Sequence, residues 1–226
     1  MNKHIFLILA GIFLFGAIQT MAAILFPLKA ASLQTPETII GILIAAPSLA
    51  SIFVDLPLAV MSDKIGRRPM LILGSLVIMT SMALFALAKD IQLILLALIL
   101  LGLSNSIYFV SALAVITENS TQTNHAKNQG INGAVQGLSA FFGALVAGSL
   151  LEQHGFITTF MFSCFLGILC ALFALLVRDS IPTHQRMREV TKWSQGIINA
   201  GKLFKQNNFI QTAALFGAIY GISFFV

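Results

Sequence analysis

Long uninterrupted apolar runs, separated by short polar segments, dominate this sequence. A helix needs about 20 apolar residues to cross the hydrocarbon core of a bilayer, and six runs reach that length. The runs are continuous rather than alternating, which predicts helices and not the strands of a membrane barrel. The predicted spans are Ile5–Leu28, Ile39–Ser62, Pro69–Ala88, Ile91–Ile116, Gly130–Leu151 and Phe156–Val177.

The two ends of this pattern need separate interpretation. Lys3 and the apolar run after it are typical of a signal peptide, but apolar sequence continues through Phe26, so we expect an uncleaved first helix. Residues 178–208 are polar and basic, which predicts a cytoplasmic linker, either with a short interfacial helix or as a solvated chain. We expect residues 1–177 to form a six-helix bundle and residues 209–226 to begin a seventh helix.

Composition supports a membrane protein. Of the 226 residues, 58% are hydrophobic and only 9% are charged, whereas a soluble domain has roughly a quarter of charged residues. The chain therefore has to face lipid. The expected fold class is an all-α, multi-pass helical bundle.

The basic residues predict the orientation of this bundle. With a cytoplasmic N-terminus, 11 of the 13 Lys and Arg residues fall on the inner side, and only Lys29 and Lys89 fall outside. This asymmetry follows the positive-inside rule and favours the cell (inner or plasma) membrane. The net charge of +5 is spread over short loops, so it does not indicate nucleic-acid binding.

Few residues suggest catalysis or metal binding. Cys164 and Cys170 lie six positions apart on one apolar run and do not share a helix face, and the four histidines fall at helix ends or in loops. We find neither a catalytic set within the spans nor a Gly-rich phosphate loop. We therefore expect no metal, no cofactor and no enzymatic activity.

A weak internal repeat links the two halves of the predicted bundle. A shift of 89 residues places Asp63-x-x-Gly66 on Glu152-x-x-Gly155, and each copy ends the second helix of a three-helix group. The two copies fall on opposite membrane faces. Three helices followed by three helices of opposite orientation form an inverted-topology repeat.

The most informative segment is residues 59–71, Ala-Val-Met-Ser-Asp-Lys-Ile-Gly-Arg-Arg-Pro-Met-Leu. It resembles the loop between helices two and three of major facilitator superfamily transporters, Gly-x-x-x-Asp-(Arg/Lys)-x-Gly-(Arg/Lys)-(Arg/Lys). The matching residues are Asp63, Lys64, Gly66, Arg67 and Arg68, whereas Ala59 departs from the leading glycine.

The resemblance implies a fold and a function. Transporters of this family have twelve helices in two six-helix halves, so this chain would be the N-terminal half and would lack its C-terminal partner half. The charged loop would act as a conformational latch. In relatives, an arginine after the glycine pairs with an acid at the end of helix four, where Glu118 stands here.

One carboxylate lies well inside a predicted span. Asp55 precedes Asp63 by eight residues, hence about 12 Å deeper along a helix that rises 1.5 Å per residue. A charge at that depth usually marks an ion or substrate path. Asp55 is therefore the candidate for proton coupling. The alternative is a structural acid that is hydrogen-bonded to nearby backbone or to the partner half.

Polar residues on helices one, four and five are the candidates for contact with a small-molecule substrate. Amides and a phenol suit hydrogen bonds to a neutral solute, although each could instead join two helices. They are Gln19, Asn105, Tyr108, Asn132 and Gln136. On the fifth predicted helix, Gly133-x-x-x-Gly137 permits close approach of another backbone.

Two functions from different classes remain open. The first is a secondary transporter that moves a small solute by alternating access, coupled to protons. The second is a truncated, non-transporting fragment or a six-helix regulatory or assembly protein of the membrane.

Overall fold

The computed structural model describes residues 3–121 and 123–177, all in one compact unit. The predicted linker (178–208) and the predicted start of a seventh helix (209–226) lie outside the described residues. In the described part the helical elements are α1 (Lys3–Ser32), α2 (Glu37–Ile65), α3 (Arg67–Leu87), α4 (Ile91–Glu118) and α5 (His125–Leu176).

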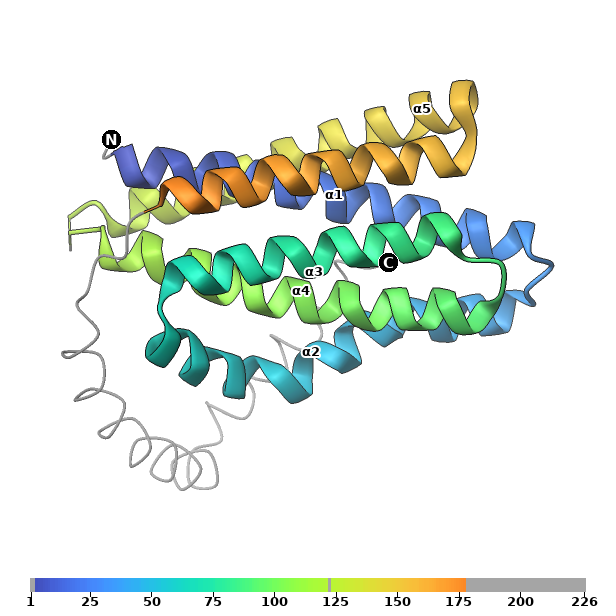
Figure 1. The fold of residues 1–226 in the computed structure, drawn as a ribbon. Coiled ribbons are helices and arrows are strands. Elements are labelled where there is room, and N and C mark those ends of the chain that lie inside the picture. Colours follow the sequence, from blue (N-terminus) through green and yellow to red (C-terminus); the bar gives the residue numbers. More distant parts are fainter. Residues whose placement is uncertain (1–2, 122, 178–226) are drawn as a thin grey trace. The chain divides into compact units, whose positions relative to one another are not determined.

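The element α5 consists of two helical arms. Gly155, with φ 74° and ψ −179°, breaks the helix, and the chain reverses there (Figure 1). The first arm, residues 125–154, corresponds to the fifth predicted span, and the second arm, residues 156–176, corresponds to the sixth. All six predicted spans are therefore helical, and the prediction of an all-α membrane bundle is confirmed.

Successive helices run up and down the bundle (Figure 1). In the described part, four helices are long and apolar enough to cross a membrane, namely α1, α3, α4 and α5. The element α2 is also long, at 29 residues, and contains Pro47 and Pro57. Figure 1 shows that α2 bends along its course, as expected where proline removes a backbone hydrogen bond.

Two glycines provide the turns that the internal repeat predicts. Gly66, between α2 and α3, has φ 116°, and Gly155 has φ 74°. They are the glycines with positive φ in the described part, and they lie at opposite ends of the bundle (Figure 1). L-residues with a side chain rarely adopt these angles. The acid-x-x-Gly pattern therefore marks equivalent helix reversals in both three-helix groups.

The end of the second span differs from its predicted position, whereas the start of the fourth span agrees with it. The second span continues past Ser62, so Asp63 lies in the last turn of α2 rather than after it. The fourth helix begins at Ile91 because the Asp90 side chain accepts a hydrogen bond from the Leu93 N–H at 2.9 Å. An aspartate at this position satisfies one of the free donors at a helix start.

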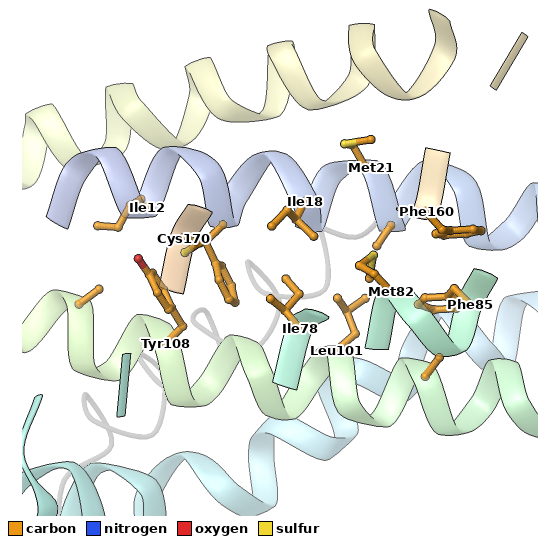
Figure 2. Close-up of a cluster of buried hydrophobic side chains, with 14 of the residues drawn as sticks. Ile12, Ile18, Met21, Ile78, Met82, Phe85, Leu101, Tyr108, Phe160 and Cys170 are labelled. Atoms are coloured by element: carbon orange, nitrogen blue, oxygen red, sulfur yellow. The ribbon is translucent and has the colours of Figure 1, made fainter. Parts of the chain in front are cut away.

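The core lies between α1, α3, α4 and the second arm of α5. Figure 2 shows Ile12, Ile78, Leu101 and Phe160 among the side chains that meet there. The rings of Phe85 and Phe160 stack with centroids 5.4 Å apart. Large apolar side chains thus hold these four helices together.

The helix α2 and the first arm of α5 contribute less to this core. The helix α2 packs mainly on α4, and the first arm packs on α1. Buried residues of the first arm are small or polar, such as Ser139, Gly143 and Ala147. A Cβ added to Gly143 would lie 2.6 Å from the Ala17 carbonyl oxygen, so the two backbones approach closely.

We expect Gly155→Ala to lower the free energy of unfolding by about 1–2 kcal/mol, because alanine at φ 74° is strained. Gly148→Ala is the matched control, because neither glycine has another atom within 4 Å of an added Cβ and Gly148 is helical. Thermal unfolding midpoints in detergent would measure both. Equal midpoints for the two variants would contradict the prediction.

Candidate functional site

Arg67 is the centre of a charged cluster at the junction of α2 and α3. Its Nη2 lies 2.6 Å from Asp63 Oδ1, and its Nε donates to Glu118 Oε1 at 2.9 Å. Its Nη1 donates to Ser62 Oγ, also at 2.9 Å. All three nitrogens of the guanidinium group therefore contact acceptors, on the last turn of α2 and on the end of α4.

The local sequence explains this arrangement. The Gly66 N–H donates to the Ser62 carbonyl oxygen at 3.1 Å and ends α2, and α3 begins one residue later at Arg67. Because only Gly66 separates the two helices, Asp63 and Arg67 face each other across the junction. The end of α4 packs beside them and supplies Glu118, which is 51 positions away in sequence from Arg67.

The cluster is largely shielded from solvent. The side chains of Arg67, Asp63 and Glu118 are 12%, 28% and 15% exposed. Two carboxylates share one guanidinium group, and Glu118 Oε2 is buried without a hydrogen-bond partner in the described part of the chain. Shielded charges interact more strongly than surface charges, and their partners are costly to remove.

The other two basic residues of the segment have different surroundings. Lys64 and Arg68 are both exposed. Arg68 adjoins a surface hollow along α3 with Pro69, Ile72, Leu73 and Leu76. The structure thus gives Arg67 a different position from its neighbours, which the sequence motif alone does not distinguish.

Ser62 also belongs to this cluster, although the sequence motif does not mark it. Ser62 and Ser111 are both completely buried, and their hydroxyl oxygens lie 2.9 Å apart. The only sequence signal for Ser62 is its place directly before Asp63. The partner Ser111 comes from α4, 49 positions later, so a contact of this kind requires the tertiary structure.

Asp55 lies on an exposed part of α2. Within the described residues it makes no hydrogen bond and no ion pair. As a structural acid, Asp55 was expected to be hydrogen-bonded either to nearby backbone or to the partner half. The exposed position gives no support to a bond with nearby backbone. A contact with a partner half remains compatible with the exposed position.

Four of the five predicted substrate contacts are either half-buried or lack a hydrogen-bond partner among the described residues. Gln19, Asn105 and Gln136 are half-buried. Asn132 is only 5% exposed, and its Oδ1 has no hydrogen-bond partner among the residues that the structure describes. No hydrogen bond joins these four amides to one another in that part of the chain.

The fifth candidate, Tyr108, was assigned to the wrong environment. Its side chain is buried in the core, where its ring stacks on Phe15 with centroids 4.2 Å apart. Its hydroxyl lies against Gly11 and Cys170 (Figure 2). Tyr108 therefore holds α1, α4 and the second arm of α5 together and lines no open surface.

The Gly133–Gly137 pair, which permits close helix approach, has no close neighbour in the described part of the chain. Nothing among the described residues lies within 4 Å of a Cβ added to either glycine. The tight approach on this arm is at Gly143, against α1. In residues 3–121 and 123–177, no group of three or more His, Cys, Asp or Glu residues is arranged to hold a metal ion.

Comparisons with known proteins agree with this architecture. The family model described as Major Facilitator Superfamily matches residues 8–226. A quinolone resistance protein, NorA of Staphylococcus aureus, is 25% identical over 179 residues, which cover 78% of this chain and 45% of the relative. The multidrug transporter protein MdtP of Bacillus subtilis is 26% identical over 113 residues, covering 50% of this chain and 21% of the relative.

A solved structure shows the same fold. The crystal structure of the human organic anion transporter MFSD10 (TETRAN) superposes with a TM-score of 0.67 at 16% identity, covering 81% of this chain and 50% of that one. The chain spans about half the length, or less, of each of these three proteins.

Proposed function

Because the chain belongs to the Major Facilitator Superfamily, we propose that it forms the N-terminal half of a secondary transporter of the inner or plasma membrane. That family consists of transporters rather than enzymes, and the chain is a multi-pass membrane protein. Its N-terminus faces the cytoplasm, as the basic residues predict. The half rocks against a second six-helix half to expose a midplane site alternately to each side.

The Arg67 cluster carries this proposal. It joins the end of α2, the start of α3 and the end of α4 through contacts of 2.6–2.9 Å. In the proposed latch, these contacts are made in one conformation and lost or exchanged in the other. A shielded charge cluster can bias a two-state equilibrium by a few kcal/mol, which is enough to set which side is open.

The partner half supplies the missing contacts of the latch. Two carboxylates share one guanidinium group, and Glu118 Oε2 has no partner in the described residues. A hydrogen-bond donor from the second half would satisfy this oxygen when the two halves close. Lys64 and Arg68, both exposed beside the cluster, provide positive charge for acidic groups of that half or of the membrane surface.

The substrate is a small organic solute that is bound mainly by shape and by amide hydrogen bonds. Gln19, Asn105, Asn132 and Gln136 supply those amides. The support comes from these amides, which are half-buried or, in the case of Asn132, buried. It also comes from the names of two relatives, which refer to quinolone resistance and multidrug transport. A fluorescent quinolone is therefore the first probe.

Proton coupling is assigned to Asp55, which is exposed on α2 and has no partner in the described part of the chain. An ionisable side chain within a membrane span is expensive and usually functional. Its carboxyl group would take up and release a proton as the two halves rearrange.

We expect Asp55→Asn to abolish quinolone transport driven by a pH gradient while leaving exchange at equal pH intact. The measurement uses proteoliposomes that contain the protein expressed from its complete gene, with and without an imposed gradient. Glu37→Gln is the control, because Glu37 is an exposed carboxylate in the first turn of the same helix. Gradient-driven transport that survives Asp55→Asn would remove the coupling role. No movement of the quinolone or of other organic solutes by the parent protein would favour the non-transporting alternative.

A further inference from the structure

Two buried hydroxyl groups lie behind the Arg67 cluster. Ser62 Oγ accepts a hydrogen bond from Arg67 Nη1 at 2.9 Å and lies 2.9 Å from Ser111 Oγ. Both serines have an exposed fraction of 0%. Because a guanidinium group can only donate, Ser62 must be the acceptor in its bond to Arg67. A continuous chain of contacts thus runs from Arg67 through Ser62 to α4.

We propose that Ser62 is the positioning residue of the latch and that the Ser62–Ser111 bond is a second attachment of α2 to α4. The inference rests on the latch function proposed above. In this assignment, Ser62 does not contact substrate. It fixes the direction in which the Arg67 guanidinium group points.

The geometry of Arg67 supports the positioning role. Its Nε and Nη2 reach Glu118 and Asp63, on two different helices. The remaining nitrogen, Nη1, reaches Ser62. A planar guanidinium group with all three nitrogens held can adopt only one orientation. Without the serine hydroxyl, the shielded side chain could turn toward one carboxylate and leave the other.

The spacing on α4 supports the second attachment. Ser111 and Glu118 are seven residues apart, which is about two helical turns, so they lie on the same face of α4 and roughly 10 Å apart along its axis. Glu118 holds the start of α3 through Arg67, and Ser111 holds the last turn of α2 through Ser62. One attachment would let the α2–α3 junction pivot on α4, whereas two attachments prevent rotation.

Ser62 also belongs to the end of α2 itself. Its carbonyl oxygen accepts the Gly66 N–H at 3.1 Å, which closes the last turn. The same residue therefore contacts the turn, the latch arginine and the neighbouring helix. A movement of the turn, of Arg67 or of α4 is therefore passed directly to the other two, because all three contact Ser62.

The test measures the distance between spin labels at Ile65 and Thr121, which are exposed residues at the end of α2 and just beyond the end of α4. The protein from the complete gene would be placed in lipid nanodiscs, with Cys164 and Cys170 replaced by alanine. We expect Ser62→Ala and Ser111→Ala each to raise the population with an altered distance by about three- to tenfold, as for the loss of one buried hydrogen bond. Ser75→Ala is the control, because Ser75 is equally buried and donates to Leu71 O of its own helix, and its contact with Cys170 Sγ is already removed in the labelled protein.

A second comparison separates positioning from general packing. If Ser62 acts through Arg67, then Ser62→Ala and Glu118→Gln should combine less than multiplicatively, since both disturb the same arginine, and the effect of Ser62→Ala that remains in the Glu118→Gln background should equal that of Ser111→Ala. Independent, multiplicative effects would overturn the positioning role. Ser111→Ala keeps the test decisive if Ser62→Ala fails to fold, because Ser111 contacts Ser62, which in turn contacts Arg67.

Asp63→Asn in the same labelled protein distinguishes the proposed latch from the proposed role of the two serines. A shift with Asp63→Asn, but none with either serine variant relative to Ser75→Ala, would overturn the serine inference and leave the latch intact. No shift with any of the variants, Asp63→Asn included, would overturn the latch and with it the proposed function of the cluster. A shift with Asp63→Asn and with both serine variants is the expected result.

Discussion

Asp63→Asn is expected to lower transport by about 100-fold without preventing membrane insertion. The carboxylate lies 2.6 Å from Arg67 Nη2, and the two side chains are 28% and 12% exposed. Removing one partner of a buried ion pair costs roughly 3–5 kcal/mol, and the partial exposure here brings the expected effect toward or below the lower end of that range. Asparagine keeps the shape and one oxygen of the side chain, so the lost quantity is the charge that pairs with Arg67 in the proposed latch.

Initial rates of quinolone transport in proteoliposomes would measure this effect, with insertion checked by the amount of protein that detergent extracts from membranes. Asp90→Asn provides a matched control. Asp90 accepts a hydrogen bond from the Leu93 N–H through Oδ1, and an asparagine side chain can accept the same bond. Transport by Asp63→Asn at the rate of Asp90→Asn would rule out the charge of Asp63 as a component of the latch.

Gly102→Ala is expected to lower the free energy of unfolding by about 3 kcal/mol, at the upper end of the range for overpacking. A Cβ at position 102 would lie 2.8 Å from Pro47 Cα and closer still to the Pro47 carbonyl oxygen. Backbone atoms cannot move aside as a side chain can. The helices α2 and α4 would have to separate, and the bond from Ser51 Oγ to the Gly102 carbonyl oxygen, already 3.4 Å long, would be lost.

The measurement is the midpoint of thermal unfolding in detergent, followed by size-exclusion chromatography of heated samples. Gly130→Ala is the control, because Gly130 is an exposed helical glycine with nothing within 4 Å of an added Cβ. Alanine there should be neutral or stabilising by up to about 1 kcal/mol. Similar midpoints for Gly102→Ala and Gly130→Ala would mean that α2 and α4 do not pack closely at Pro47.

The sequence predicted the helices well because lipid imposes a simple rule on a spanning segment. A continuous apolar run of sufficient length has to be helical, whatever it packs against. Turns were predictable for a similar local reason. Gly66 and Gly155 adopt backbone angles that favour glycine, and each follows an acidic residue by three positions. Neither inference required knowledge of a neighbouring helix.

Assignments to a particular helix face were less successful. Tyr108 was predicted to contact substrate but is buried in the core, and among the described residues the close helix approach on this arm is at Gly143, which the Gly133–Gly137 spacing did not indicate. In a membrane, apolar residues are required on faces that meet lipid as well as on faces that meet other helices. The hydrophobic pattern therefore carries little information about which face is turned inward.

The sequence by itself determined the helical spans, the glycine reversals and the family motif around Asp63 and Arg67. These features depend on residues close together in the chain and on the cost of exposing backbone to lipid. The tertiary structure decided that Arg67 reaches Ser62, Asp63 and Glu118 at once, and that Ser111 supports Ser62 from α4. Contacts between residues 49–51 positions apart depend on how α2 and α3 pack on α4, and uniform apolar surfaces leave that packing unspecified in the sequence pattern.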